Sequence, residues 1–304
     1  MNSLTQMLAE KADSIYSWLF FGTLFGVLCW EMAAPLRALS ASTATRWRGN
    51  GALFVINGAL LWAVFPTVGV GAAAYAEAHG WGLLRQLELP FWLVCVVSVA
   101  LLDLGHYIIH YAFHRAPLLW RVHRLHHTDT EFDFSTGTRF HPLEALPEHG
   151  ANLIVTLLVG PPVPVAILFV LAYAFTTFWV HGNIRMPAGW DRTLRRVVIT
   201  PEMHRTHHST EAAETNSNYG GLLSCWDLLF GTYVDAPRLG HAQLRIGQDG
   251  FCAPRDIELV GMLMNPFLSA ESAEQRAQPV PETTSRVIPL HRARERSERR
   301  RTIS

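Results

Sequence analysis

Charged residues are scarce in this chain of 304 residues. They make up 16% of it, whereas hydrophobic residues make up 49%, and the formal net charge is zero. A water-soluble globular protein usually carries about a quarter charged residues. The shortage of charge therefore indicates that lipid covers part of the surface. The zero net charge gives no general electrostatic reason to expect a nucleic-acid partner.

Cysteine is also sparse. The four cysteines, Cys29, Cys95, Cys225 and Cys252, lie far apart in the sequence. This spacing excludes a disulfide framework and a thiolate zinc site. The N-terminal segment lacks a basic region followed by a cleavage site of small residues, so we expect its apolar run to be a retained membrane segment rather than a signal peptide. No Gly-rich nucleotide loop is apparent.

Long apolar stretches are what the chain has instead. Three of them are long enough to cross a bilayer, which takes roughly 20 residues. They run from about 14 to 35, from about 51 to 78 with a kink expected at Pro66, and from about 87 to 109. A fourth, from about 152 to 180, is interrupted by Gly160-Pro161-Pro162-Val163-Pro164 and is too short for two full spans. We expect this fourth stretch to form a hairpin that enters the membrane and returns to the same side.

Arginines set the expected orientation. They follow the first apolar stretch at Arg37, Arg46 and Arg48, and the third at Arg115, Arg121 and Arg124. The positive-inside rule then places the N-terminus outside and everything after Ile109, except the hairpin, in the cytoplasm. Histidine-rich segments before and after the hairpin would share one face of the membrane.

These features predict an all-α fold. We expect an integral membrane helical bundle of three spans plus a Pro-broken hairpin, with a cytoplasmic helical cap that carries the histidine motifs. Residues 1–100 would form the N-terminal transmembrane helices, residues 101–240 a domain that carries the histidine motifs and the membrane hairpin at 152–180, and residues 241–304 a C-terminal region. Composition predicts disorder from about residue 270, with a basic end that is either solvated or held against anionic lipid.

Histidine is abundant, with 15 residues, most of them in tight spacings. Three, His106, His110 and His114, lie four residues apart and therefore share one helix face. The pattern His-Arg-x-His-His occurs twice, before and after the fourth apolar stretch, at 123–127 and 204–208, and His181 precedes the second copy.

Clustered imidazoles of this kind indicate a metal site. Neutral imidazole suits iron, zinc, copper and nickel, so the ligand type leaves the metal open. Nine histidines exceed the four ligands of a structural zinc site, but they suit two metals with open positions. The clusters contain no Glu-x-x-His pair, which distinguishes them from the soluble carboxylate-bridged four-helix design.

Two non-enzymatic alternatives stay open at this point. A metal transporter should place polar ligands near the midplane of several spans, whereas these histidines lie past the span ends. A membrane scaffold with a structural metal predicts full coordination and no oxygen consumption. Solvated surface histidines are a third alternative, although clustered imidazoles without a metal would repel one another as they become protonated.

The order of motifs between about Asp103 and Tyr233 resembles the fatty acid hydroxylase/sterol desaturase superfamily, which includes methylsterol oxidase and alkylglycerol monooxygenase. The motifs are D-x-x-H-Y-x-x-H-x-x-x-H from Asp103, L-W-R-V-H-R-L-H-H from Leu119, R-F-H-P-L-E from Arg139, H-G-N at His181, T-P-E-M-H-R-T-H-H-S from Thr200, N-Y-G at Asn218 and W-D-L-L-F-G-T-Y from Trp226.

The resemblance implies a di-iron centre, with two iron ions and O2 as co-substrate, that hydroxylates an unactivated C–H bond of a lipid. The implied metal ligands are His110, His114, His123, His126, His127, His181, His204, His207 and His208. Desaturation and ether-lipid oxidation are alternatives that use the same site. We see no haem or flavin segment, so we expect electrons from a separate ferredoxin, cytochrome or reductase, and we expect the protein to lie in a bacterial cytoplasmic membrane.

The chain departs from the family pattern at two positions. Tyr111 stands where an Arg is usual, and Thr177 stands where some members have a further histidine. The second departure predicts that one iron has an incomplete or water-filled shell.

Other residues are expected near the centre. Possible metal or supporting residues are His106, His141, Asp103, Glu144, Asn183 and Asp227, the last four because a metal-bound histidine generally donates its second ring nitrogen to a carboxylate or carbonyl. The isolated His79, His149, His241 and His291 are expected to be ordinary surface or structural residues.

Overall fold

The computed structural model describes residues 3–39, 43–65 and 69–269, and within these ranges it contains helices and no strand. The all-α prediction is confirmed. The expected disorder from about residue 270, together with His291, lies outside the described residues.

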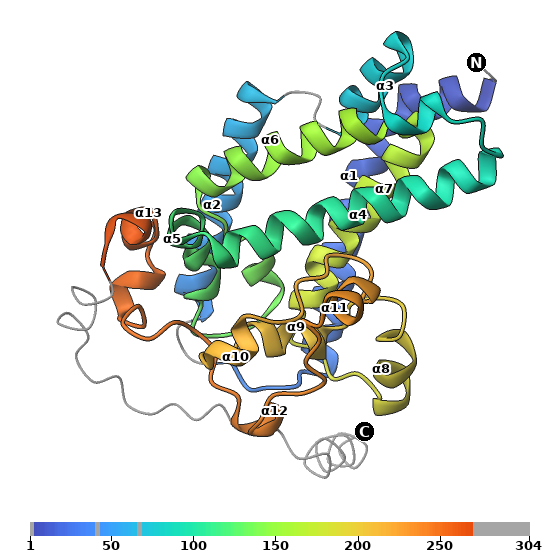
Figure 1. Ribbon diagram of the computed structural model, residues 1–304. Coiled ribbons are helices and arrows are strands. Elements are labelled where there is room, and N and C mark those ends of the chain that lie inside the picture. The colour runs from blue at the N-terminus through green and yellow to red at the C-terminus, as the bar shows by residue number, and fades with distance from the viewer. Residues whose placement is uncertain (1–2, 40–42, 66–68, 270–304) are drawn as a thin grey trace, which may run out of the picture.

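Five long helices form the body of the molecule (Figure 1). They are α1 (Ser3–Ala33), α2 (Thr43–Val64), α4 (Phe91–Arg115), α6 (Pro142–Val159) and α7 (Val163–His181). α1 packs mainly along α7, and α4 packs on α6 and α7. At the far end, α3 (Val70–His79) contacts α6 and α7, and the short η1 (Leu83–Gln86) contacts α6.

The three-span prediction is confirmed only in part. α4 and α7 are long and apolar enough to cross a membrane, whereas the apolar part of α1, Trp18–Ala33, is shorter. The expected second span is divided between α2, which ends at Val64, and α3, which begins at Val70. The kink expected at Pro66 lies outside the described residues.

The expected hairpin consists of α6 and α7. Its turn is shorter than the proline run predicted, because Val163 and Pro164 already belong to the first turn of α7, where proline is tolerated. Gly160 ends α6 in the left-handed conformation, at φ 64°. A Cβ atom there would lie 2.5 Å from the carbonyl oxygen of Trp81. The hairpin tip therefore packs backbone against backbone on the loop before η1.

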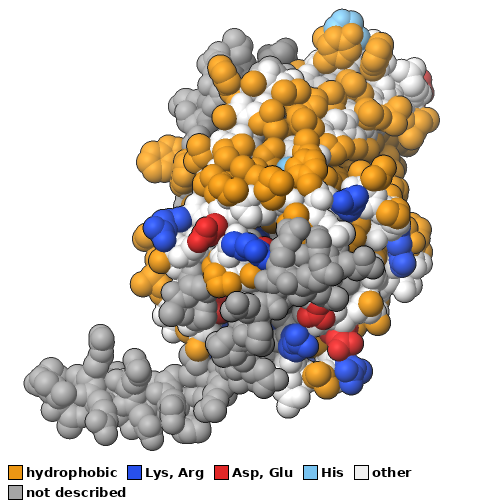
Figure 2. All heavy atoms as spheres, turned by 90° about the vertical axis from the view of Figure 1, so that its left-hand side faces the viewer, with side chains coloured by type: hydrophobic (Ala, Val, Ile, Leu, Met, Phe, Trp, Pro, Cys, Tyr) orange, Lys and Arg blue, Asp and Glu red, His pale blue; other side chains and the backbone are white. Residues whose placement is uncertain are grey.

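Large apolar side chains of the long helices face outward. Trp18 of α1 is 80% exposed, Trp62 of α2 77% and Phe91 of α4 68%. Figure 2 shows that hydrophobic side chains gather over the upper part of this face, whereas charged side chains gather below. Exposed apolar surface on this scale marks a surface that contacts lipid or a partner, and beside the two apolar helices it indicates a membrane protein.

Short helices form a cap beside and below the long ones, with α5 and α13 at the left in Figure 1 and α8 to α12 below. In chain order they are α5 (Pro117–His127), η2 (Phe134–Thr138), α8 (Ala188–Leu194), α9 (Pro201–His207), α10 (Ala212–Thr215), α11 (Cys225–Phe230), α12 (Gly240–Gln243), η3 (Pro254–Ile257), α13 (Leu259–Met264) and η4 (Asn265–Phe267).

Buried arginines fasten the cap to the long helices. Arg46 of α2 pairs with Asp129 and Asp133, and all three side chains are fully buried. Arg124 of α5 bonds the Asn265 and Leu268 carbonyls. Segment 254–268 is therefore part of the cap.

Candidate metal centre

The nine histidines expected as ligands converge in the structure and form two groups. Cluster 1 consists of His110, His114, His123, His127 and His207, and cluster 2 consists of His126, His181, His204 and His208. Within each cluster the candidate ligand atoms lie within 4.8 Å of one another.

The repeated His-x-x-His-His motif explains why there are two clusters. Successive residues of an α-helix point about 100° apart, whereas residues four apart share a face. On α5, His123 and His127 accordingly face cluster 1, while His126 faces cluster 2. On α9, the neighbours His207 and His208 divide between the clusters in the same way. Each motif thus contributes to both sites.

The distances between ring nitrogens fit a shared cation. In cluster 2, the Nε2 atom of His181 lies 3.1 Å from that of His126 and 3.0 Å from that of His204, which lies 3.3 Å from that of His208. Nitrogens that share one ion at about 2.0–2.1 Å would show such separations. In cluster 1, the His123 and His127 Nε2 atoms are 3.2 Å apart.

Hydrogen bonds at the second ring nitrogens fix four of the histidines. His110 donates from Nδ1 to the Tyr219 carbonyl (2.9 Å), His207 to the Ser217 carbonyl (2.6 Å) and His181 to the Thr177 carbonyl (2.6 Å). The fourth hydrogen bond joins His123 Nδ1 and Glu144 Oε1 at 2.5 Å. A backbone carbonyl only accepts, so in His110, His181 and His207 Nδ1 carries the proton and Nε2 keeps its lone pair.

Three buried ring nitrogens of cluster 1 have no hydrogen-bond partner among the described residues. Nε2 of His207 and both ring nitrogens of His114 are buried, and none of the described residues hydrogen-bonds to them. Buried polar atoms are seldom left without partners. The donor set therefore fits two metal ions that prefer nitrogen ligands.

The cap histidines are neutral at physiological pH. Burial lowers the pKa of His123 to about 3, and burial together with neighbouring histidines lowers the pKa values of His126, His127 and His208 well below their ordinary value. A neutral imidazole is the form that binds a metal. Burial also raises the pKa of the Glu144 carboxyl well above its usual range.

One loop holds two of the histidines through its carbonyls. Asn218 adopts the left-handed conformation, at φ 50°, and its side chain bonds Met203 and Val234. Its neighbours Ser217 and Tyr219 turn their carbonyls to His207 and His110. The N-Y-G motif thus sets the orientation of two cluster 1 rings.

The four expected polar partners have different roles. Glu144 is the one that bonds a histidine directly. Asp227 accepts from the amides of Tyr219 and Gly220, and Asp103 accepts from those of Leu222 and Leu223, so both aspartates hold the loop that carries the Tyr219 carbonyl. Asn183 pairs with the backbone of Arg37 and contacts none of the nine histidines.

His141 and His106 lie outside both clusters. His141 caps α6: its Nδ1 accepts from the Leu143 amide and its Nε2 donates to the Leu263 carbonyl, so neither nitrogen is left for a metal. The His106 ring stacks on Tyr173, with ring centroids 4.0 Å apart.

Two adjoining cavities lead to the clusters. The outer cavity, of about 720 Å³, is largely apolar. The inner cavity, of about 230 Å³, reaches His110 and His123 of cluster 1 and His126, His181 and His204 of cluster 2. Neither cavity was predicted from the sequence. It also missed Glu148 and His149, which line both of them although His149 was expected to be an ordinary residue.

The fold and the two clusters define an all-helical protein with a histidine-rich centre at the inner end of apolar cavities. Residues 95–232 match the fatty acid hydroxylase family model. The resemblance to that superfamily is confirmed.

Curated relatives agree with this assignment. An ornithine lipid hydroxylase of Rhizobium tropici is 33% identical over 180 residues, which cover 59% of this chain and 52% of that protein. An alkylglycerol monooxygenase of Danio rerio is 31% identical over 165 residues, 52% of this chain and 35% of that protein. The chain thus spans about half the length of these relatives or less. No solved structure matches.

Proposed function

We propose that the protein is a membrane-bound, non-haem di-iron oxygenase that hydroxylates an unactivated C–H bond of a lipid. One observation carries the proposal: nine histidines form two clusters at the inner end of an apolar cavity. The reaction would consume O2, two electrons and two protons for each C–H bond converted to C–OH, and would release one water.

The donor set supports two irons. Each cluster is made of imidazoles, without a thiolate, and three of the rings have their tautomer fixed for ligation at Nε2. When bound, iron would supply the oxygen and one-electron chemistry that no side chain can perform. Cluster 1 offers five histidines and cluster 2 four. We infer that the open position expected beside Thr177 belongs to cluster 2, because Thr177 bonds His181 through its carbonyl.

The chain would bind and orient the lipid. Phe20, Phe169 and Phe178 line the outer cavity, so an alkyl chain could lie there with little water around it. Excluding water protects an oxidising centre from side reactions. The fixed carbonyls and Glu144 would hold the rings in place while the substrate binds.

Partners and location are part of the same proposal. We propose that a ferredoxin, cytochrome or reductase delivers the electrons. We also propose that the cap faces the cytoplasm, in a bacterial cytoplasmic membrane. The domain boundaries at about residues 100 and 240 stay as expected from the sequence, although 254–268 packs on the cap.

Oxidation of an ether lipid is the second candidate, because four relatives are alkylglycerol monooxygenases. Desaturation is a third outcome of the same oxidant.

Lipid analysis after expression tests the proposal. Cells that express the protein under isotopically labelled O2 should accumulate a lipid with one labelled oxygen, and cells with the double variant His207→Ala/His208→Ala should not. A product that has lost two hydrogens would indicate desaturation, and cleavage products would indicate an ether substrate. No O2-dependent product would contradict the oxygenase proposal.

A further inference from the structure

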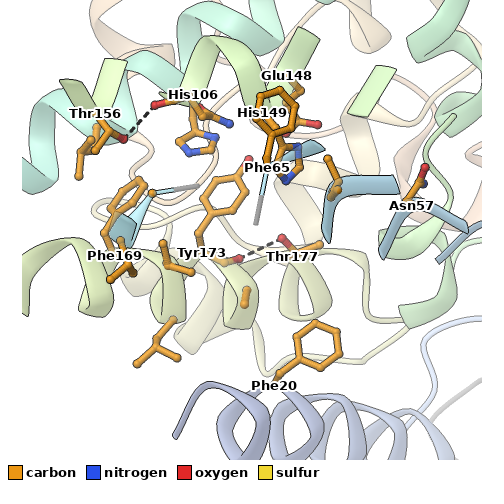
Figure 3. Close-up of a pocket in the computed structure, with 18 of the residues that line it drawn as sticks. Phe20, Asn57, Phe65, His106, Glu148, His149, Thr156, Phe169, Tyr173 and Thr177 are labelled. Atoms are coloured by element: carbon orange, nitrogen blue, oxygen red, sulfur yellow. Dashed lines mark hydrogen bonds between the residues drawn. The ribbon is translucent and has the colours of Figure 1, made fainter. Parts of the chain in front are cut away.

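The outer and inner cavities meet at a polar neck. Six residues line both cavities and define this neck, namely His106, Phe140, Glu148, His149, Tyr173 and Thr177. They come from α4, α6 and α7 and from the residue before His141. Figure 3 shows His106, Tyr173 and His149 close together, in reach of the space between the helices.

Several polar atoms of the neck have no hydrogen-bond partner in the part of the chain that the structure describes. Among the described residues, none hydrogen-bonds the Glu148 carboxylate, the ring nitrogens of His106 or the Tyr173 hydroxyl, whereas the Thr177 hydroxyl bonds the Tyr173 carbonyl. His149 donates from Nδ1 to the Ala145 carbonyl, so its Nε2 is left to accept. Polar groups half-buried in a cavity are expected to bind a ligand or water.

The charge of the neck limits what it can bind. No lysine or arginine lines either cavity, whereas Glu144 and Glu148 both do. A carboxylate or phosphate would lie beside the Glu148 carboxyl without a compensating cation, which is costly in a buried site. A group that donates a hydrogen bond, such as a hydroxyl or an amine, would find acceptors at Glu148 and at His149 Nε2.

We propose that the neck binds the polar end of the lipid substrate, a hydroxyl or amino group that donates to Glu148, while the alkyl chain occupies the outer cavity. This inference rests on the proposed lipid oxygenase function. It adds that the carbon to be oxidised lies near the polar end of the lipid rather than at the methyl end. A chain that entered methyl end first would bury the polar atoms of the neck against CH2 groups, without hydrogen bonds.

Binding of matched C16 probes to the metal-depleted full-length protein tests the inference without depending on catalysis. The probes are hexadecylamine, hexadecanol, hexadecanoate and hexadecane, measured in one detergent by equilibrium dialysis. Hexadecylamine and hexadecanol should bind about tenfold more tightly than the other two, the difference expected for one hydrogen bond to a charged group.

Glu148→Gln should weaken hexadecylamine binding about tenfold and change hexadecanol binding much less, because the amide still accepts a hydrogen bond but carries no charge. His149→Leu should weaken the binding of both probes. Glu258→Gln makes the same chemical change at an exposed position and should bind all four probes like the wild type. Retained binding of hexadecane shows that each variant is folded.

Equal binding of hexadecanoate and hexadecylamine, or an unchanged order of affinities in Glu148→Gln, would overturn the inference. If the order holds but the iron-containing protein oxidises none of the probes, the neck assignment stands and the proposed oxygenase function is in question. If oxidation occurs and mass spectrometry places it at the methyl end, the inference is wrong while the oxygenase proposal stands.

Discussion

Glu144 offers the sharpest test of how the protein prepares cluster 1. Its Oε1 atom accepts from His123 Nδ1 at 2.5 Å, and both side chains are almost fully buried. Its other oxygen has no partner among the described residues. With no metal present, burial favours neutral forms of both groups. A cation on His123 Nε2 would favour a proton on Nδ1 and an ionised Glu144, so each would strengthen the other.

Removing this carboxylate should weaken one metal site and leave the other. Loss of a partner to a metal-bound histidine typically costs 10- to 100-fold in affinity, about 1.4–2.7 kcal/mol. Glu144→Gln keeps an oxygen that can accept a hydrogen bond from His123, so its loss of metal affinity should lie near the lower limit of this range. Glu144→Leu removes the acceptor and should approach the upper one.

Anaerobic titration with Fe(II) against a competing chelator measures both sites. We expect one of two binding steps to weaken in the Glu144 variants. Glu148→Gln is the matched control, because Glu148 lies one helical turn away on α6 and makes no hydrogen bond to any of the nine histidines. Both iron-binding steps of this variant should have wild-type affinity. The reasoning would be refuted if Glu144→Leu bound both irons with wild-type affinity.

Three further changes test the loop, the hairpin and the buried histidines. Asn218→Ala should lower iron content more than Asn218→Gly does, because glycine tolerates the left-handed backbone at φ 50°. Equal iron content in the two variants, measured by metal analysis, would argue against a backbone effect. Gly160→Val should lower the Tm by several degrees, since a Cβ would lie 2.5 Å from a carbonyl oxygen and the backbone is left-handed. Gly58→Ala should leave the Tm unchanged, because a Cβ at Gly58 would have no atom within 4 Å. In metal-depleted protein, the free energy of unfolding should fall as pH drops below about 6.5, because the unfolded chain then binds protons that buried His123, with its pKa of about 3, does not. The loss is on the order of 1 kcal/mol per histidine by about pH 5.5. A free energy of unfolding that stays constant over this range, measured by chemical denaturation, would contradict this expectation.

The sequence predicted the clusters because helix periodicity acts locally. The spacing of His123, His126 and His127 fixes their directions on α5, and the second motif repeats it on α9. Sequence could not predict which partner each ring would take. Three of them are backbone carbonyls, of Thr177, Ser217 and Tyr219, and any residue type supplies a carbonyl.

Tertiary packing explains the remaining differences between the predictions from sequence and the structure. His141 lies in a family motif, but its position at the start of α6 makes it a helix cap that also reaches the Leu263 carbonyl, a contact across 122 positions of sequence. The neck was missed because Glu148 and His149 come to line the same cavities as His106 and Tyr173 only when three helices meet. The expected second span is divided between two helices because apolar composition alone did not reveal where α2 ends and α3 begins.

Iron content, resolved by cluster, tests the central claim most directly. Protein purified anaerobically with iron supplied should contain two irons per chain. His123→Ala/His127→Ala removes ligands of cluster 1 and His181→Ala/His208→Ala removes ligands of cluster 2, so each double variant should keep one iron, with a different Mössbauer spectrum in each case. One zinc per chain, or no bound metal in the wild type, would contradict the di-iron account.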